Sequence, residues 1–125
     1  MTFHLKQGVD IQDLTKLTPN TLILFADFVS FCYRNKLPCV ITSLCEDVPG
    51  RISSTHREGR AFDASSGGWT DDEIGKCEKY FNEKFKDIAA ISYIDNLPRA
   101  CIYHKVNGWH FHFQARRMEL TDEET

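Results

Sequence analysis

The residues that decide the fold are STHREGRAFD at positions 54–63 and WHFHF at positions 109–113. Together the two segments hold three of the five histidines, and the first also contains an aspartate with small neighbours. Imidazole nitrogen and carboxylate oxygen are ligands that suit Zn²⁺, and a catalytic zinc has three protein ligands and one open position. We therefore expect His56, Asp63 and His112 to bind one zinc ion, with His110 beside the open position.

The composition is that of a single soluble domain spanning residues 1–125. Hydrophobic residues make up 42% of the chain and charged residues 26%, which is ordinary for a globular protein. The net charge of −3 gives no basic footprint, so we expect no nucleic-acid partner. No apolar run approaches the length of a membrane span, so we expect no membrane insertion. We also expect the protein to be a monomer.

The cysteines predict free thiols rather than disulfides. Their number, five, is odd, and no pair has the C-x-x-C spacing of a zinc knuckle. Free buried thiols indicate a reducing compartment. The N-terminus lacks the apolar core of a signal peptide, so we expect a protein that is cytoplasmic as synthesised. Action outside the cytoplasm would then need another route of release.

Periodicity and capping signals predict two helices and several short strands. Thr18 and Pro19 read as the N-cap and first position of an apolar helix that runs to about Asn35. Thr70 opens a second helix, to about Phe85, with Glu73 completing a capping box. A short helical turn is expected within residues 1–17. Strands are expected at 39–43, at 61–64, and on both sides of Asn107-Gly108.

The Asn-Gly pair predicts a hairpin with a two-residue loop, because both residues tolerate positive φ. This loop would place Val106 opposite Trp109 and Tyr103 opposite His112. Alternation would then put Tyr103, His110 and His112 on one working face. His104 would lie on the opposite, apolar face as a core or edge histidine.

The two segments resemble a known family of zinc peptidases. The pattern S-x-H-x-x-G-x-A-x-D looks like the zinc-binding signature of D-Ala-D-Ala carboxypeptidases and L-Ala-D-Glu endopeptidases, whose fold the hedgehog signalling domain shares. The chain matches this pattern, and the H-x-H that closes the site, with Ser54, His56, Gly59, Ala61, Asp63, His110 and His112. The resemblance implies an α+β fold, with helices packed on one face of a small antiparallel sheet. It also implies that His56, Asp63 and His112 are zinc ligands and that His110 is the non-ligand histidine near the reacting water.

Two positions depart from the family pattern. The family carries a catalytic glutamate at the position that Val106 occupies here. The arginine that binds the substrate carboxylate in these enzymes follows Ser-Gly-Tyr, a tripeptide absent from this sequence. Arg51 or Arg57 would have to take that role, with Ser54 orienting a ligand or capping the loop. The candidates for proton transfer or charge stabilisation are His110, Tyr103, Glu46 and Glu58.

The expected function is zinc-dependent hydrolysis of an amide bond in the stem peptides of peptidoglycan, as in an endolysin or a DD-carboxypeptidase. Free cysteines without a leader would fit release by a phage lysis or virion route. The alternative is a non-catalytic zinc module of the same fold that binds cell wall or a protein partner, and the valine at position 106 favours it. A non-haem iron site also uses two histidines and a carboxylate, but the seven-residue gap from His56 to Asp63 fits it less well.

Overall fold

The chain has an α+β fold with a five-stranded mixed sheet in the order β1-β2-β3-β5-β4. The computed structural model describes residues 3–46, 54–105 and 108–117. Within them the elements are β1 (His4–Leu5), the 3-10 helix η1 (Ile11–Lys16), α1 (Pro19–Asn35), β2 (Val40–Ser43), β3 (Ala61–Ser65), α2 (Asp71–Lys84), β4 (Cys101–Lys105) and β5 (Trp109–Gln114).

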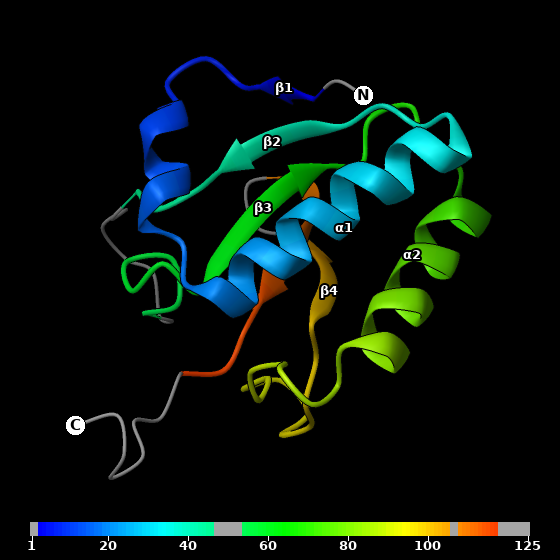
Figure 1. Ribbon diagram of the computed structural model, residues 1–125. Coiled ribbons are helices and arrows are strands. Elements are labelled where there is room, and N and C mark those ends of the chain that lie inside the picture. Colours follow the sequence, from blue (N-terminus) through cyan, green and yellow to red (C-terminus); the bar gives the residue numbers. More distant parts are fainter. Residues whose placement is uncertain (1–2, 47–53, 106–107, 118–125) are drawn as a thin grey trace, which may run out of the picture.

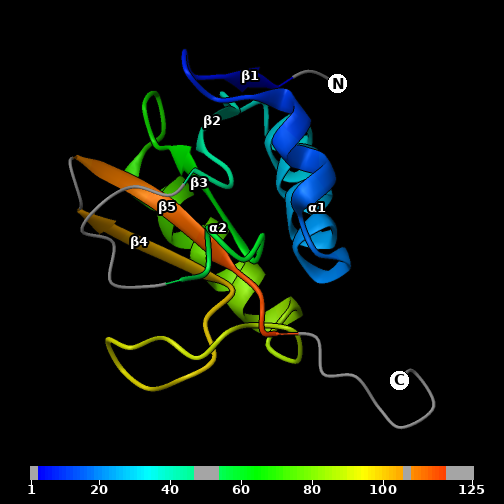
Figure 2. The same ribbon diagram turned by 90° about the vertical axis from the view of Figure 1, so that its left-hand side faces the viewer.

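Both α-helices cover the same face of the sheet (Figure 1), and Figure 2 shows the sheet edge-on with α1 along one side of it. An aromatic core fills the space between these layers. Phe28 of α1 lies at its centre, with its ring 4.7 Å from that of Phe113, while Phe62 and Phe113 stack at 4.6 Å. The opposite face of the sheet is left for polar side chains. None of the described helices is long and apolar enough to cross a membrane.

The predicted helix ends are confirmed. The Thr18 hydroxyl accepts a hydrogen bond from the Thr21 N–H, and Pro19 is the first helical residue of α1. At the start of α2 the Glu73 N–H donates to the Thr70 hydroxyl at 3.2 Å, and the Thr70 N–H donates to the Glu73 carboxylate at 2.8 Å. Each cap satisfies backbone donors that the first helical turn leaves without partners.

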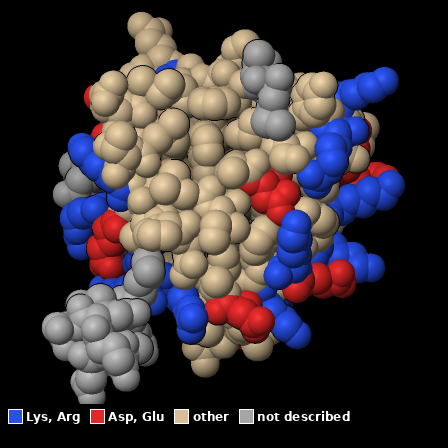
Figure 3. Space-filling view, viewed as in Figure 1, with Lys and Arg blue, Asp and Glu red and all other residues tan. Residues whose placement is uncertain are grey.

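On their outer side the two helices are joined by a cluster of polar side chains around Asp27. Its carboxylate accepts hydrogen bonds from the Tyr80 hydroxyl at 3.0 Å and from the Lys84 ammonium at 2.8 Å. Acidic and basic side chains lie beside one another over this side of the molecule (Figure 3). Exposed ion pairs of this kind each contribute little to the stability of the fold. They position α2 beside α1, and their mixed charges form no patch of one sign.

The sheet differs from the expected antiparallel one at its first strand. His4–Leu5 pairs with Val40–Ile41 in parallel, whereas the other pairings are antiparallel. A strand of two residues is too short to show a periodic signal in the sequence. β3 lies in the middle of the sheet, with Phe62 and Ala64 facing the helices and Ala61 and Asp63 facing the other way.

The predicted hairpin register is wrong by one residue. Lys105, rather than Val106, pairs with Trp109, so three residues separate the strands instead of two. Gly108 takes a φ of +109°, as suits the last position of a three-residue loop, while Val106 and Asn107 lie outside the described residues. The side chain of Asn82 on α2 fixes this register by bonding both the N–H and the carbonyl of Cys101, each at 2.9 Å.

A slip of one residue exchanges the two faces of a strand. Tyr103 and Cys101 therefore turn toward the helices, where they join the apolar side chains of Phe111 and Phe113. His104 turns the other way and shares a face with His110 and His112. The register thus packs Cys101 and Tyr103 against the helices and gathers three histidines on the open face.

Gly59 joins this sheet to the N-terminal part of the chain. Its φ is +71°, and a side chain there would collide with the backbone carbonyl of Lys16. The Gly59 carbonyl accepts a hydrogen bond from the Thr18 N–H at 3.0 Å. Glycine is required here both for its backbone conformation and for the close approach.

We expect Gly59→Ala to lower the free energy of unfolding by roughly 1–3 kcal/mol, because it combines left-handed backbone with a steric clash. Gly75→Ala is the matched control, since Gly75 is exposed within α2 with open space around it. That control should raise the free energy of unfolding by about 0.5–1 kcal/mol. Urea denaturation measures both, and equal effects of the two substitutions would contradict the assigned role of Gly59.

Candidate metal centre

Three predicted ligands converge on the open face of the sheet. Asp63 of β3 and His112 of β5 are direct partners in the antiparallel ladder, so their side chains lie side by side. His56 comes from the turn that precedes β3, where the Arg60 N–H donates to the Thr55 carbonyl and the Gly59 N–H donates to the His56 carbonyl. The motif is therefore a compact turn followed by the central strand.

The ring of His56 is fixed by a backbone carbonyl. Its Nδ1 lies 2.6 Å from the carbonyl oxygen of Leu44, which follows β2. A carbonyl can only accept, so Nδ1 carries the proton and the neutral ring keeps a lone pair on Nε2. That Nε2 faces Asp63 Oδ1 at 3.2 Å.

The ring of His112 is fixed in the same manner by a side-chain amide. Its Nε2 lies 3.1 Å from Gln114 Oε1, and the amide nitrogen of Gln114 donates to the Ala90 carbonyl at 3.3 Å. The amide is thereby oriented with its oxygen toward His112, so Nε2 is the donor and Nδ1 keeps the lone pair. Nδ1 faces Asp63 Oδ1 at 2.8 Å.

Two imidazole lone pairs and one carboxylate thus point at the same small volume. The three side chains are buried, and their ligand atoms lie within 4.8 Å of one another. Burial raises the pKa of Asp63, and only a protonated His112 or His56 would outweigh this and hold that pKa below its usual range. Buried electron pairs that face one another require a proton or a cation between them. The donor set fits a divalent metal, with His56 Nε2, His112 Nδ1 and the Asp63 carboxylate as ligands.

Two more histidines lie beside this group. His110 Nδ1 is 3.3 Å from the Gly108 carbonyl, and its Nε2 is 3.6 Å from Asp63 Oδ2. The ring of His104 packs edge-on against that of His110 with centroids 4.7 Å apart. Burial, with the neighbouring His110 and His112, lowers the pKa of His104 to about 4, so this ring is neutral near pH 7. Its buried Nε2 has no hydrogen-bond partner among the described residues.

Tyr103 is not part of this site, contrary to the sequence prediction. The one-residue change of register turns its ring to the helix side, where it lies 5.2 Å from the ring of Phe111. Its hydroxyl bonds the Ser66 hydroxyl at 2.8 Å. A side chain on that face cannot reach the histidines, which point away from the helices.

Two of the acidic candidates are held in structural contacts. Glu46 accepts hydrogen bonds from the Ser43 hydroxyl at 2.7 Å and from the Leu44 N–H at 2.6 Å, next to the carbonyl that holds His56. Glu58 pairs with Arg117 through two bonds of 2.9 Å. Arg117 and the Ser54 hydroxyl lower the pKa of Glu58 to about 2, which makes it a poor base at neutral pH.

The predicted substrate-binding residues are dispersed. Ser54 bonds Glu58 and so caps the turn, as one reading of the sequence expected, and it also lines a groove beside the site. Arg57 is exposed on the turn and does not line that groove. Arg51 lies outside the described residues, as does Val106, the position at which the family carries its glutamate.

Sequence reasoning missed the groups that orient the ligands. Gln114 follows His112 by two residues on the same strand face, so its spacing could have suggested a partner for that ring. The Leu44 carbonyl left no signal, because any residue type supplies a carbonyl. His104 was assigned to the other face through the error in the hairpin register.

Comparison of the chain with models of protein families, with curated proteins and with solved structures gives no significant match.

We expect Gln114→Leu to weaken zinc binding by roughly 10- to 100-fold while all three ligands remain, because the ring of His112 loses the acceptor that orients it. Gln114→Glu keeps an oxygen in that place and should retain tight binding. His56→Ala and His112→Ala should abolish stoichiometric zinc. Competition with a fluorescent chelator measures each affinity, and an unchanged affinity in Gln114→Leu would show that the amide does not support the site.

Proposed function

We propose that this protein is a zinc-dependent peptidase that hydrolyses an amide bond in the stem peptides of peptidoglycan. One observation carries the proposal: His56 Nε2 and His112 Nδ1 both face Asp63 Oδ1, at 3.2 and 2.8 Å, while their other ring nitrogens face fixed acceptors. Three protein ligands of this kind, with an outer acceptor for each imidazole, are typical of catalytic zinc sites.

Zinc bound by these residues would lower the pKa of a coordinated water from about 15.7 toward 7 and polarise the scissile carbonyl. The protein must then supply a group that moves protons. His110 is the best candidate, since its Nδ1 is directed to the Gly108 carbonyl and its Nε2 faces the ligand group. Imidazole is the side chain most often used in enzymes to accept a proton and to return it.

His104 supports this assignment as a positioning residue. It packs against His110 on the side away from β3, and its low pKa keeps it uncharged near pH 7. A neutral neighbour limits the repulsion that His110 meets when it takes up a proton. The pair thereby offers a route for proton transfer at a site where the sequence has valine in place of the family's glutamate.

The substrate class depends on the resemblance of the two motifs to the D-Ala-D-Ala carboxypeptidases and L-Ala-D-Glu endopeptidases. The α+β fold, with helices on one face of the sheet and the histidines on the other, supports the hedgehog/DD-peptidase-like architecture proposed from this resemblance. Release by a phage lysis or virion route would bring such an enzyme to its substrate.

The second candidate is a zinc module of the same fold that has lost hydrolysis. The sequence favours it at one position, because Val106 cannot act as an acid or base. In addition, Asp63 is the only carboxylate that pairs with His110 among the residues the structure describes. Such a module would hold zinc as a structural ion and bind cell wall or a protein partner.

The deciding experiment treats the stem peptide L-Ala-γ-D-Glu-L-Lys-D-Ala-D-Ala and purified cell walls with the zinc-loaded protein. We expect cleavage products by mass spectrometry, and none after chelation. His110→Ala should retain about one zinc per chain yet lose roughly 100-fold or more in rate, because only the proton-transfer group is removed. His4→Ala, which alters an exposed histidine of β1, should change neither property.

Three results would count against parts of this proposal. Full zinc content without cleavage of either substrate would favour the binding module. Zinc loss in His110→Ala would mean that His110, rather than His112, is the third ligand. Cleavage that persists after complete removal of metal would exclude the proposed chemistry.

A further inference from the structure

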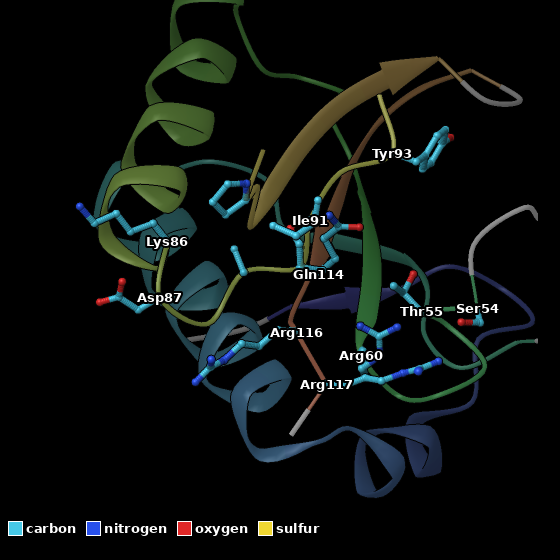
Figure 4. A pocket seen from close by; sticks show the side chains of 13 residues that line it. Ser54, Thr55, Arg60, Lys86, Asp87, Ile91, Tyr93, Gln114, Arg116 and Arg117 are labelled. Carbon is cyan, nitrogen blue, oxygen red and sulfur yellow. Dashed lines mark hydrogen bonds between the residues drawn. The ribbon is translucent and has the colours of Figure 1, made fainter. Parts of the chain in front are cut away.

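A groove adjoins the metal centre on the same side of the molecule and has a volume of about 810 Å³. Gln114 lines it and holds His112, while Thr55 lines it one residue before His56. Figure 4 shows Gln114 and Ile91 in the middle of the groove, with Lys86 and Asp87 on one side and Ser54 and Thr55 on the other. The groove is therefore continuous with the residues that orient the ligands.

The groove carries an excess of positive charge. Four cationic residues and one acidic residue, Asp87, line it: Arg60, Lys86, Arg116 and Arg117. Arg60 and Arg117 both pair with Glu58, at 3.0 and 2.9 Å. Lys86 and Arg116 are exposed, and neither makes a side-chain hydrogen bond or an ion pair with any residue that the structure describes. Two cations are thus available to an anionic ligand.

One wall of the groove is apolar and ordered. Ile91 and Tyr93 are 59% and 65% exposed, so their side chains are accessible to a ligand. Their loop is held by an isolated bridge between Ile91 and Pro98 and by the Ser92 N–H, which donates to the Leu97 carbonyl at 2.8 Å. The Ala90 carbonyl, just before Ile91, accepts a hydrogen bond from the side-chain amide of Gln114. This bond links the loop directly to the metal centre.

Backbone hydrogen bonds also hold the end of the groove that carries Lys86 and Arg116. The Arg116 N–H donates to the Ile88 carbonyl at 2.8 Å, and Ala89 forms a bridge with Ala115. The segment after α2 and the end of β5 are therefore joined side by side, which keeps Lys86 and Arg116 at the same end of the groove. Two neighbouring cations beside an apolar wall fit a ligand with carboxylates on an aliphatic backbone.

We propose that this groove binds the carboxylate-bearing part of the peptide whose amide bond lies at the metal centre. Lys86 and Arg116 bind carboxylate groups, and Ile91 and Tyr93 pack against the aliphatic part of the same peptide. This inference rests on the proposed peptidase function and adds a location and a charge preference for the substrate. It predicts that free carboxylates in the stem peptide improve binding and that their amidation weakens it.

The test compares the stem peptide L-Ala-γ-D-Glu-L-Lys-D-Ala-D-Ala with the same peptide amidated at its glutamate α-carboxylate and at its C-terminus. Calorimetry measures the binding of each peptide to the full chain, first to the zinc-loaded protein and then to the protein after chelation. In the chelated protein, cleavage of the peptide does not compete with binding. We expect the acidic form to bind roughly tenfold more tightly than the amidated form, with the difference shrinking at high salt.

The paired substitution Lys86→Glu with Arg116→Glu should remove this preference and weaken binding of the acidic peptide by roughly tenfold. The matched control is Lys6→Glu with Lys79→Glu, which changes the net charge equally at two exposed positions outside the groove. That control should bind like the unmodified chain. Zinc content and the melting temperature of every variant show whether the fold and the metal centre are intact.

The outcomes separate this inference from the proposed function. Equal binding of both peptides, or equal loss in the groove variant and its control, overturns the groove even if the zinc-loaded chain cleaves the peptide. Charge-dependent binding without any cleavage supports the groove and overturns the peptidase function. Charge-dependent binding together with cleavage supports both.

Discussion

The structure depends on three buried, electron-rich side chains that face one another: His56, Asp63 and His112. Asp63 Oδ1 faces a ring nitrogen of His56 at 3.2 Å and one of His112 at 2.8 Å, and the far nitrogen of each ring donates to an oxygen that cannot give a proton back. An arrangement of this kind is unfavourable unless something positively charged lies between the groups. A divalent cation satisfies all three at once, whereas a single proton satisfies only one pair.

The rest of the fold holds these three side chains in place. Asp63 and His112 are neighbours in the two central strands, and the aromatic core formed by Phe28, Phe62 and Phe113 holds those strands from the helix side. Gly59 brings the His56 turn against the N-terminal segment, and Gln114 ties His112 to the loop that forms the wall of the groove. Helices cover only one face, so the other stays open to a ligand.

The sequence predicts well those features that depend on local chemistry. Caps at Thr18 and Thr70 and the apolar stripe of α1 are set by neighbouring residues, and the cluster of His56, Asp63 and His112 was expected from residue types that suit a metal ion. The hairpin register depends on longer-range contacts, because Asn82 of α2 bonds the backbone of Cys101 and selects which side chains of β4 are buried. That choice moved Tyr103 away from the site and His104 toward it. The acceptor for His56 has no sequence signature, because it is a backbone carbonyl, whereas the spacing of Gln114 from His112 could have suggested the second acceptor.

The most direct test of the metal centre is a crystal structure of the zinc-loaded protein with anomalous data on both sides of the zinc absorption edge. We expect one strong anomalous peak about 2.0–2.2 Å from His56 Nε2, His112 Nδ1 and an oxygen of Asp63, the usual lengths of zinc–nitrogen and zinc–oxygen bonds. The outer ring nitrogens should still face the Leu44 carbonyl and the Gln114 amide. No peak at that point, with Asp63 bonded directly to a protonated imidazole in zinc-saturated crystals, would contradict it.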